Sequence, residues 1–442
     1  MYFIYIFVCA LSTVAAQSAT AKLSFLPTLE TVVGGISEFT GILNNFYDIF
    51  SILVTDNITD IQGNLSVSVP EDAYLNISQL AKKYGYPLEV HKPVTEDGYI
   101  LNIHRIPHGR NGKRNNITVF LMHGILDSSD SWVIQGPERA LCYILADEGF
   151  DVWMGNARGN KYATEHVLYN TSHPEFWKFT WEEIGIYDTA RMIDHILYYN
   201  GNRSIYYIGH SQGTTTFYVM NSMKPEYNEK IKMMFSMAPV AWMTHVRSPL
   251  IRLVSPGFQS LSYYLSDLNV YVPSITFFNK ISAYVCSVLS VKCDNLLQMI
   301  VGTDWRSING TMMPIMLGHM FSGSSTLQFV HYGQLVQSKR FCRFDFGPEV
   351  NSKRYGVQEP PDYDLSKITI PVGLFYSSED WVADPYDVNL LKQHLPNVFM
   401  YEFLGDYNHL DYLYASDNKE RVFSKIIKSI YDFEHGRNST TE

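Results

Sequence analysis

Short apolar segments alternate with amphipathic segments through much of the chain between residues 85 and 240. Thr118–Met122 is apolar at nearly every position, which is typical of a strand covered on both faces. The alternation predicts strands at 118–122, 150–154, 204–208 and 232–237, with helices between them that include 140–146 and 188–198. Strands and helices that alternate in this way form a parallel sheet with helices on both faces. The sequence therefore predicts an α/β fold with a mostly parallel central sheet.

The alternation stops after residue 240 and returns near the end of the chain. The later pattern predicts strands at 370–376 and 398–403 and helices at 385–395 and around 421–431. One sheet interrupted by a long insertion explains this better than three separate domains, because large α/β folds often exceed the roughly 150 residues of an average domain. We therefore predict a core in two parts, 71–240 and 366–442, a mainly helical cap or lid at 241–365, and an N-terminal extension of unknown role at 17–70.

The first residues have the composition of a secretion signal. Residues 2–15 carry no charge and end in small side chains, and Val14 and Ala16 fit a cleavage site before Gln17. This apolar run is shorter than the roughly 20 residues that a membrane-spanning helix needs. We predict a signal peptide at 1–16 and entry into the secretory pathway, with an extracellular or lysosomal destination.

Sequons and cysteines agree with that compartment. Eight Asn-X-Ser/Thr sequons together favour a glycoprotein, and they begin at Asn57, Asn64, Asn76, Asn116, Asn170, Asn202, Asn309 and Asn438. Cys9 leaves with the signal, and Cys286 and Cys293 are close enough in sequence to form a small disulfide loop in an oxidising lumen. The alternative is four buried free thiols, which would include Cys142 and Cys342.

The charge and the cysteine spacing argue against several functions. The 34 Lys and Arg residues against 44 Asp and Glu give a net charge of -10, whereas a nucleic-acid-binding protein needs a basic surface. No C-x-x-C pair occurs, which argues against a thiol–disulfide enzyme and a structural zinc site. We expect neither a metal nor an organic cofactor. An aromatic content of 14% suits a protein that handles apolar material.

The sequence Gly209-His210-Ser211-Gln212-Gly213 is the first candidate for catalysis. A G-x-S-x-G pattern alone is weak, but here it follows a predicted strand and leads into a predicted helix. In such a turn the two glycines let the backbone fold back sharply, and the serine hydroxyl stands above the carboxyl end of the sheet. We predict that Ser211 is a nucleophile. The alternative is a solvated serine in a Gly-rich loop.

A nucleophilic serine needs a base, and the base needs a carboxylate that orients it. In this type of fold the order along the chain is serine, acid, histidine, with the acid and the histidine after late strands. His409 follows the predicted strand at 398–403 and has the best position among the 14 histidines. We predict that His409 is the base.

Four carboxylates follow the predicted strand at 370–376, namely Glu379, Asp380, Asp384 and Asp387. Asp387 is expected inside the next helix, and Asp384 is expected to be the N-cap of that helix because a proline follows it. Asp380 is therefore the preferred acid and Asp384 is the alternative.

An oxyanion hole needs two backbone N–H donors aimed at the developing negative charge. One donor is the residue after the nucleophile, Gln212, and the other comes from the loop after an early strand. Thr118–Met122 is followed by His123, Gly124 and Ile125, which predicts the Ile125 N–H as the second donor. The alternative is an ordinary turn at the end of a strand.

Eight motifs are spread over most of the chain: YGYP at 84–87, TEDGYIL at 95–101, HG at 123–124, DVWMGNARGN at 151–160, EFW at 175–177, GHSQG at 209–213, ADP at 383–385 and YNHLD at 407–411. From about Asn76 to Tyr431 the chain resembles the acid lipases, the family that contains gastric lipase and lysosomal acid lipase. The combination of motifs is highly specific. The resemblance implies an α/β-hydrolase core with a cap and lid inserted near 241–365.

The resemblance also implies the roles of the site residues. Ser211 would be the nucleophile, Asp380 the acid and His409 the base, with the Ile125 and Gln212 amides as the oxyanion hole. The spacing from the acid to the base agrees with the family pattern, which favours Asp380 over Asp384. Cys286 and Cys293 fall near the family's cap disulfide, although they are closer together than that pattern suggests. The extension at 17–70 has no counterpart in the family.

The implied reaction is hydrolysis of a neutral lipid ester, a triacylglycerol or a steryl ester, through an acyl-enzyme. We expect a monomer that meets its substrate at a lipid–water interface, and contact with a membrane or lipid-droplet surface fits this expectation. The apolar runs at 261–265 and 270–278 are candidate acyl-facing segments of a mobile lid, or else the small core of the insertion itself. The rival functions are a serine esterase for smaller soluble esters and a non-catalytic lipid-binding protein on a lipase scaffold.

Overall fold

The computed structural model describes residues 69–249, 251–252, 255, 271–272, 301–302 and 312–436. The chain divides into two compact units, Met1–Ser68 and Val69–Glu442, and all described residues belong to the second. The predicted signal peptide, almost all of the predicted extension and most of the predicted acyl-facing segments lie outside the described residues. The same holds for Cys286, Cys293 and four sequons, those at Asn57, Asn64, Asn309 and Asn438.

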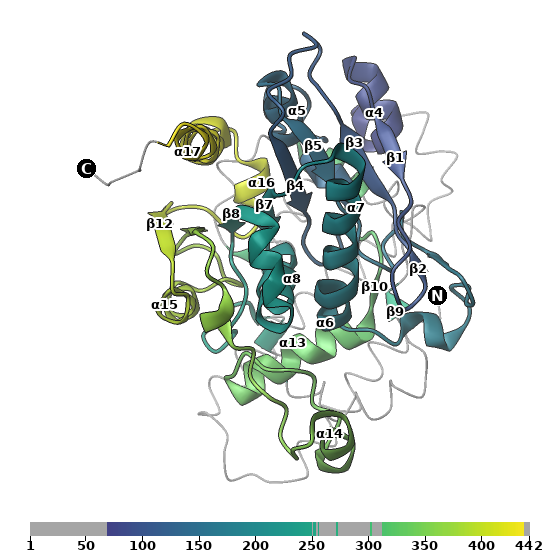
Figure 1. Cartoon of the computed structure of the whole chain (residues 1–442), viewed down its shortest axis with the longest axis vertical. Helices are drawn as coiled ribbons and strands as arrows, with labels where there is room; N and C mark the ends of the chain where they lie inside the picture. Colours follow the sequence, from purple (N-terminus) through teal and green to yellow (C-terminus); the bar gives the residue numbers. More distant parts are fainter. Residues whose placement is uncertain are drawn as a thin grey trace, which may run out of the picture. The chain divides into compact units, whose positions relative to one another are not determined.

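An eight-stranded sheet with the order β1-β3-β5-β4-β7-β8-β11-β12 forms the centre of this unit (Figure 1). Its strands are β1 (Glu89–His91), β3 (Ile103–Ile106), β4 (Thr118–Met122), β5 (Asp151–Met154), β7 (Ile205–His210), β8 (Ile231–Met237), β11 (Val372–Tyr376) and β12 (Val398–Phe403). The pairs β1–β3 and β3–β5 are antiparallel, and every other neighbouring pair is parallel. The predicted α/β-hydrolase core with its mostly parallel sheet is confirmed.

Two short antiparallel pairs lie outside the large sheet. β2 (Tyr99–Ile100) pairs with β6 (Glu165–His166), and β9 (Tyr271–Val272) pairs with β10 (Ser324–Ser325). Both strands of the second pair belong to the predicted insertion. The short pairs were not expected from the sequence, because two residues are too few to show a strand pattern.

The helices of the unit are α4 (Ile77–Tyr84), α5 (Leu141–Asp147), α6 (Trp181–Glu183), α7 (Ala190–Asn200), α8 (Gln212–Met223), α12 (Met312–His319), α13 (Thr326–Ser338), α14 (Pro348–Tyr355), α15 (Pro385–His394), α16 (Asp411–Tyr414) and α17 (Ser424–Glu434). Figure 1 shows α7 and α8 side by side across one face of the sheet. The predicted helix at 188–198 is only the second half of a longer one, because α6 continues through a π-helical segment, Ile184–Thr189, into α7. The described part of the insertion between β8 and β11 consists mainly of helices.

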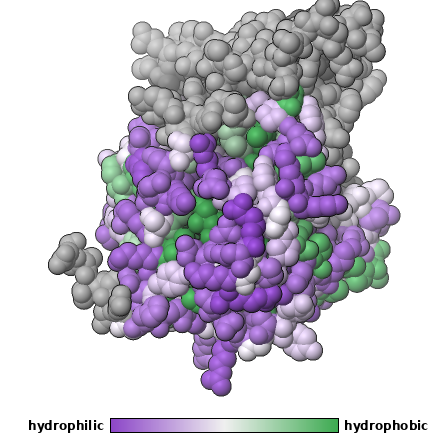
Figure 2. Space-filling model, turned by 90° about the horizontal axis from the view of Figure 1, so that it is seen from above, coloured by the Kyte–Doolittle hydropathy of each residue, from purple (hydrophilic) through white to green (hydrophobic). Residues whose placement is uncertain are grey.

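Buried cysteines and exposed sequons bear on the secretory features of the sequence. Cys142 and Cys342 are buried free thiols, and burial raises the pKa of both. Three of the described sequon asparagines are exposed and the fourth, Asn202, is partly buried, the exposed ones being Asn76, Asn116 and Asn170. On the face in Figure 2 the described surface is mainly hydrophilic, with apolar residues in small separate patches. Isolated apolar residues of this kind are normal on a folded protein.

Four buried histidines are held in the neutral form. Burial lowers the pKa from 6.5 to about 4 for His104 and His123 and to about 3 for His210 and His331. His331 on α13 also stacks on Trp181 of α6 with the ring centroids 3.6 Å apart, so it joins the insertion to the core. An unfolded chain binds protons on these side chains near pH 6.5, whereas the folded chain does not until the pH is much lower. Folding is therefore opposed progressively as the pH falls from about 6.5 toward 4.

We predict that His331→Phe lessens this loss of stability, because phenylalanine keeps the ring stack and cannot take up a proton. The free energy of unfolding is measured with urea between pH 4 and pH 6. Its decrease per pH unit should be smaller in the variant than in the wild type by about 1.4 kcal/mol, the slope that corresponds to one bound proton. Tyr332→Phe on the same helix changes a hydroxyl that does not titrate in this range and should leave the slope unchanged. An unchanged slope in His331→Phe would contradict the prediction.

Candidate active site

Ser211 occupies the turn between β7 and α8 in a strained backbone conformation. Its φ of 53° and ψ of -120° are rare for any residue with a side chain. A Cβ added to Gly209 would lie 2.8 Å from the carbonyl carbon of Gly213, and a Cβ added to Gly213 would lie 2.2 Å from the Met122 oxygen. Both glycines of the motif are therefore required by close backbone contacts. The turn holds the serine at the carboxyl end of β7, where the sequence predicts it.

Ser211, His409 and Asp380 form a continuous hydrogen-bonded chain. The Nε2 atom of His409 lies 2.7 Å from the Ser211 Oγ, and its Nδ1 lies 2.9 and 3.0 Å from the two carboxylate oxygens of Asp380. Ser211 and His409 are each 6% exposed and Asp380 is 0% exposed. The structure thus brings together the predicted nucleophile, base and acid from the ends of β7, β12 and β11. This arrangement can pass a proton from the serine to the histidine while the carboxylate orients the ring.

The other carboxylates after β11 have different partners. The Oδ1 atom of Asp384 accepts a hydrogen bond of 2.9 Å from the Tyr386 N–H and so caps α15, and its Oδ2 pairs with Arg247 Nε at 2.8 Å. Asp387 accepts hydrogen bonds from the backbone and the ring of His245. The Oδ1 of Asp380 also accepts hydrogen bonds from two backbone N–H groups, at 2.9 and 2.8 Å, which fix the direction of the carboxylate. Asp380 is therefore the carboxylate placed to orient His409.

The segment after β4 lies directly against Ser211. A Cβ added to Gly124 would lie 3.2 Å from the Ser211 Cβ and 3.6 Å from its Oγ. Gln212 is the first residue of α8, and the N–H groups in the first turn of a helix have no acceptor within that helix. The two predicted oxyanion donors, the amides of Ile125 and Gln212, thus belong to segments on two sides of the serine.

His123 fixes the orientation of the peptide group that contains the Ile125 N–H. The Ala157 N–H donates to His123 Nε2 at 3.2 Å, so Nε2 is unprotonated and Nδ1 carries the proton. Nδ1 donates that proton to the Gly124 carbonyl oxygen at 2.7 Å. The Gly124 carbonyl and the Ile125 N–H lie in one planar peptide group, so a hydrogen bond at one end sets the direction of the other. In the sequence His123 is recognisable only as part of the turn after the strand at 118–122.

His210 holds the loop that carries His409. Its Nε2 donates to the carbonyl oxygen of His409 at 2.8 Å, and the two rings are 5.3 Å apart. Because burial lowers the pKa of His210 to about 3, this ring carries no positive charge near neutral pH. The middle position of a G-x-S-x-G motif gives no signal of this role in the sequence.

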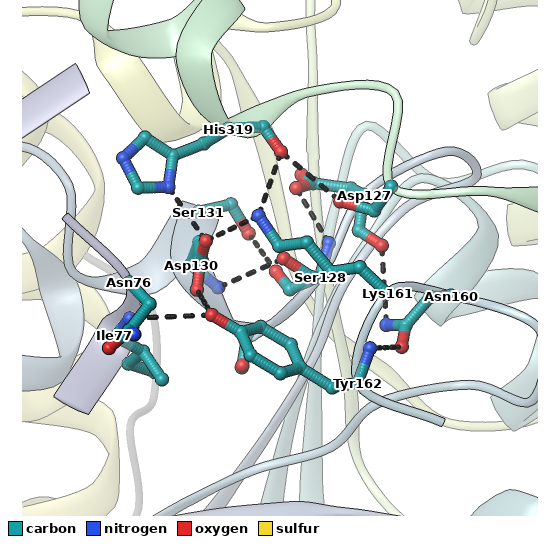
Figure 3. Close-up of polar contacts among 12 residues, drawn as sticks. Asn76, Ile77, Asp127, Ser128, Asp130, Ser131, Asn160, Lys161, Tyr162 and His319 are labelled. Atoms are coloured by element: carbon teal, nitrogen blue, oxygen red, sulfur yellow. Dashed lines mark hydrogen bonds and ion pairs between the residues drawn. The ribbon is translucent and has the colours of Figure 1, made fainter. Parts of the chain in front are cut away.

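A buried polar cluster lies beyond the Ile125 segment, centred on Asp130 (Figure 3). The Asp130 carboxylate contacts Lys161 Nζ at 2.5 Å, His319 Nδ1 at 2.6 Å and the Tyr162 hydroxyl at 2.7 Å. Burial alone would raise the pKa of Asp130, but Lys161 and His319 hold it well below its usual range. His319 belongs to α12, so the cluster joins the insertion to the core near the segment that follows β4. No motif in the sequence indicated these residues.

Within the described residues no helix is long and apolar enough to cross a bilayer, and no group of three or more His, Cys, Asp and Glu side chains could hold a metal ion.

The chain is similar to known lipases over most of its length. Residues 117–416 match the model of the alpha/beta hydrolase fold, and residues 77–136 match a partial alpha/beta-hydrolase lipase region. Gastric triacylglycerol lipase of Rattus norvegicus is 37% identical, and the match covers 83% of this chain and 93% of that protein. Lipase 3 of Drosophila melanogaster is 39% identical, with 79% and 91% covered. Lysosomal acid lipase/cholesteryl ester hydrolase of Homo sapiens is 34% identical, with 83% and 93% covered.

We predict different outcomes for two neighbouring acids. Asp380→Asn should lower kcat by about 10⁴-fold, because an amide neither stabilises the imidazolium nor fixes the required tautomer. Asp384→Asn is the matched control, since asparagine also caps helices well and only the ion pair with Arg247 is lost. This control should keep turnover near the wild-type value and lower the melting temperature. Both variants are measured by steady-state kinetics on a soluble ester. If Asp384→Asn were the inactive variant, Asp384 and not Asp380 would be the acid.

A second site prediction concerns His123. His123→Leu removes the hydrogen bond to the Gly124 carbonyl and should lower kcat by about 10²-fold, approaching the loss of one oxyanion donor. His123→Asn should retain more activity than His123→Gln, because an asparagine amide can occupy the position of Nδ1 whereas a glutamine amide extends toward that of Nε2. Steady-state kinetics give kcat and KM for both amide variants. Equal kcat values for His123→Asn and His123→Gln would show that His123 does not act through the Gly124 peptide.

Proposed function

Because this chain belongs to the family of the gastric and lysosomal acid lipases within the α/β-hydrolases, we propose that it hydrolyses the carboxylic esters of neutral lipids. The chain is a carboxylic ester hydrolase. The observation that carries the finer proposal is the hydrogen-bonded chain from Ser211 through His409 to Asp380 at the carboxyl ends of three strands.

The proposed reaction begins with proton transfer. His409 Nε2 takes the proton of Ser211 while Oγ attacks the ester carbonyl carbon, and Asp380 stabilises the imidazolium that forms. The negative charge on the former carbonyl oxygen is stabilised by the amides of Ile125 and Gln212. His409 then returns the proton to the leaving alcohol, and the acyl group stays on Ser211. The short contact between Nε2 and Oγ, 2.7 Å, supports this first step.

The second half of the reaction repeats the same proton transfers with water. His409 takes a proton from a water molecule, which attacks the acyl-enzyme, and the fatty acid leaves with Ser211 restored. Apart from the ester and the water molecule, every reacting or hydrogen-bonding group in this cycle belongs to the chain, and no step calls for a cofactor. The near-complete burial of the triad supports the scheme, because electrostatic stabilisation of an oxyanion is stronger in a site that excludes water.

The proposed substrate class follows from the relatives. One of them is named for triacylglycerol and another for cholesteryl esters, and this chain covers more than nine-tenths of each. We therefore propose a neutral lipid ester at a lipid–water interface as the substrate and a protein that enters the secretory pathway. The exposed sequon asparagines Asn76, Asn116 and Asn170 support that route, because they are accessible for glycosylation.

The proposal is tested with a fluorophosphonate probe, which reacts with an activated serine. The wild-type protein should be labelled, whereas Ser211→Ala should be folded, unlabelled and without more than a trace of esterase activity. Ser222→Ala in α8, the helix that follows Ser211, is the control, because it removes a buried serine hydroxyl that donates to the Val219 carbonyl oxygen at 3.1 Å. Failure of the wild type to react would favour the lipid-binding alternative.

The substrate class is tested with the same preparation. Turnover on emulsified long-chain triacylglycerol or cholesteryl oleate should exceed turnover on short soluble esters and should rise once the substrate forms an interface. Smooth saturation through the solubility limit, with preference for short acyl chains, would instead identify an esterase for soluble substrates.

A further inference from the structure

The turn that carries Asp380 is held by residues of the predicted insertion. We call residues 378–384 the acid turn. The backbone N–H groups of Arg247 and Ser248 donate to the Trp381 carbonyl oxygen at 2.8 and 3.0 Å. The Arg247 guanidinium donates through Nη2 to the carbonyl oxygens of Ser378 and, at 2.9 Å, Asp380. Its Nε pairs with Asp384 at 2.8 Å, so one side chain contacts the start, the middle and the end of the acid turn.

A second part of the insertion joins the acid turn to the loop of the base. The carbonyl oxygen of Val301 accepts hydrogen bonds from the backbone N–H groups of Trp381, at 3.4 Å, and of His409, at 3.1 Å. Val301 is itself buried. A single carbonyl group therefore ties together the residue after the acid and the base itself.

Gly302 is the residue that makes this approach sterically feasible. Its φ of +119° lies in a region that side chains rarely adopt. A Cβ added there would lie 2.0 Å from the Glu379 carbonyl oxygen and 3.4 Å from the Asn408 Cβ. The glycine is thus packed between the residue before the acid and the residue before the base, and any side chain would push the acid turn away.

These contacts matter because the sheet alone does not fix the two loops. β11 and β12 are parallel neighbours whose pairing ends at Tyr376 and Phe403, several residues before Asp380 and His409. The catalytic contact between the two side chains spans only 2.9 Å, and a misplacement of about 1 Å can cost about 10²-fold in rate. Something outside the sheet must therefore hold the loops, and the contacts described above join them.

We propose that Arg247 and the peptide of Val301 and Gly302 are positioning residues for the acid and the base, so that the insertion is part of the frame of the triad. This inference rests on the proposed function, because it concerns the geometry of the same proton transfer. None of these residues touches the reacting atoms; they act through Asp380 and His409.

The first test replaces the arginine. Arg247→Met should lower kcat on a soluble ester by 10- to 100-fold and should change KM by less than about threefold. Arg247→Lys keeps the charge but not the planar fork, so it should recover only part of the activity. Asp384→Asn is the matched control: it breaks the ion pair with Arg247 and leaves the bonds to the carbonyl oxygens of Ser378 and Asp380 in place. Asp384→Asn should therefore keep activity near the wild-type value, and a loss as large as that of Arg247→Met would overturn the role of the bonds to the two carbonyl oxygens.

The second test uses two glycines of the insertion that both have positive φ. Gly302→Ala should lower kcat at least 10-fold. Gly356→Ala, also at a positive φ (+77°) but with no atom within 4 Å of the added methyl, carries backbone strain without a clash and should keep wild-type kcat. Equal kcat values for the two variants would overturn the role of Gly302. If Gly302→Ala does not fold, the arginine variants decide the question.

A double-mutant cycle separates positioning from a general structural effect. In an Asp380→Asn background, Arg247→Met should lower the remaining kcat by less than twofold, because the group that the arginine positions has already been removed. Full additivity would overturn the inference. The rate of fluorophosphonate labelling is the second readout. If the wild-type protein is not labelled, the proposed function is refuted. If the wild type is labelled and the variants Arg247→Met and Gly302→Ala are labelled at the same rate as the wild type, only the positioning role is refuted.

Discussion

The close approach of three backbone segments around Ser211 is the constraint on which the rest of the site depends. β7 leads into α8 through a turn in which Gly209 packs against Gly213, and Gly213 packs against the last residue of β4, Met122. Because no side chain fits at either glycine, the strained φ of Ser211 is imposed by its neighbours and is not a free choice of the loop. The same packing brings the segment after β4 against the serine. One steric arrangement therefore presents the Ser211 hydroxyl and also places beside it the segment that carries the Ile125 N–H, the predicted oxyanion donor.

Around this turn, buried polar groups hold the loops that the sheet cannot. Arg158 is almost fully buried and pairs with Asp97 and Asp188 at 2.5 and 2.7 Å, which anchors the loop after β5. Arg343 of the insertion pairs with the buried Glu182 of α6 at 2.7 Å. Ion pairs of this kind gain little net stability, because their desolvation offsets the attraction, but breaking one leaves an unpaired buried charge at a cost of about 3–5 kcal/mol. Their effect is to allow one arrangement of the loops and to penalise others, which suits a site that tolerates little displacement.

The contrast between the sheet and the loops held by distant polar partners explains what could be predicted from the sequence. The strands of the parallel sheet were predictable because they are largely apolar, and the meeting of Ser211, Asp380 and His409 was predictable because loops that follow the carboxyl ends of such strands lie at the same end of the sheet. The first half of the long helix from Trp181 to Asn200 was missed, because Glu182 is buried through a partner distant in sequence, Arg343, and so adds no residue to an apolar stripe. The contacts of Arg247 and Val301 were missed for a related reason: they join residues more than 100 positions and about 80 positions from the acid turn, and no local pattern records a backbone carbonyl as a partner.

The topology of the sheet nevertheless makes a contact between the insertion and the acid turn hard to avoid. The insertion leaves the sheet after β8, and β8 lies parallel to β11 with Met237 beside Phe375. A chain that continues past Met237 therefore leaves the sheet at the same end as β11, which is followed by the acid turn within a few residues. Since the insertion must cross this edge, its first residues either contact the acid turn or leave its backbone carbonyls without partners, which is costly for buried groups. Arg247 and Ser248 supply those partners, so the point at which the insertion leaves the sheet is also the point at which it contacts the turn that carries Asp380.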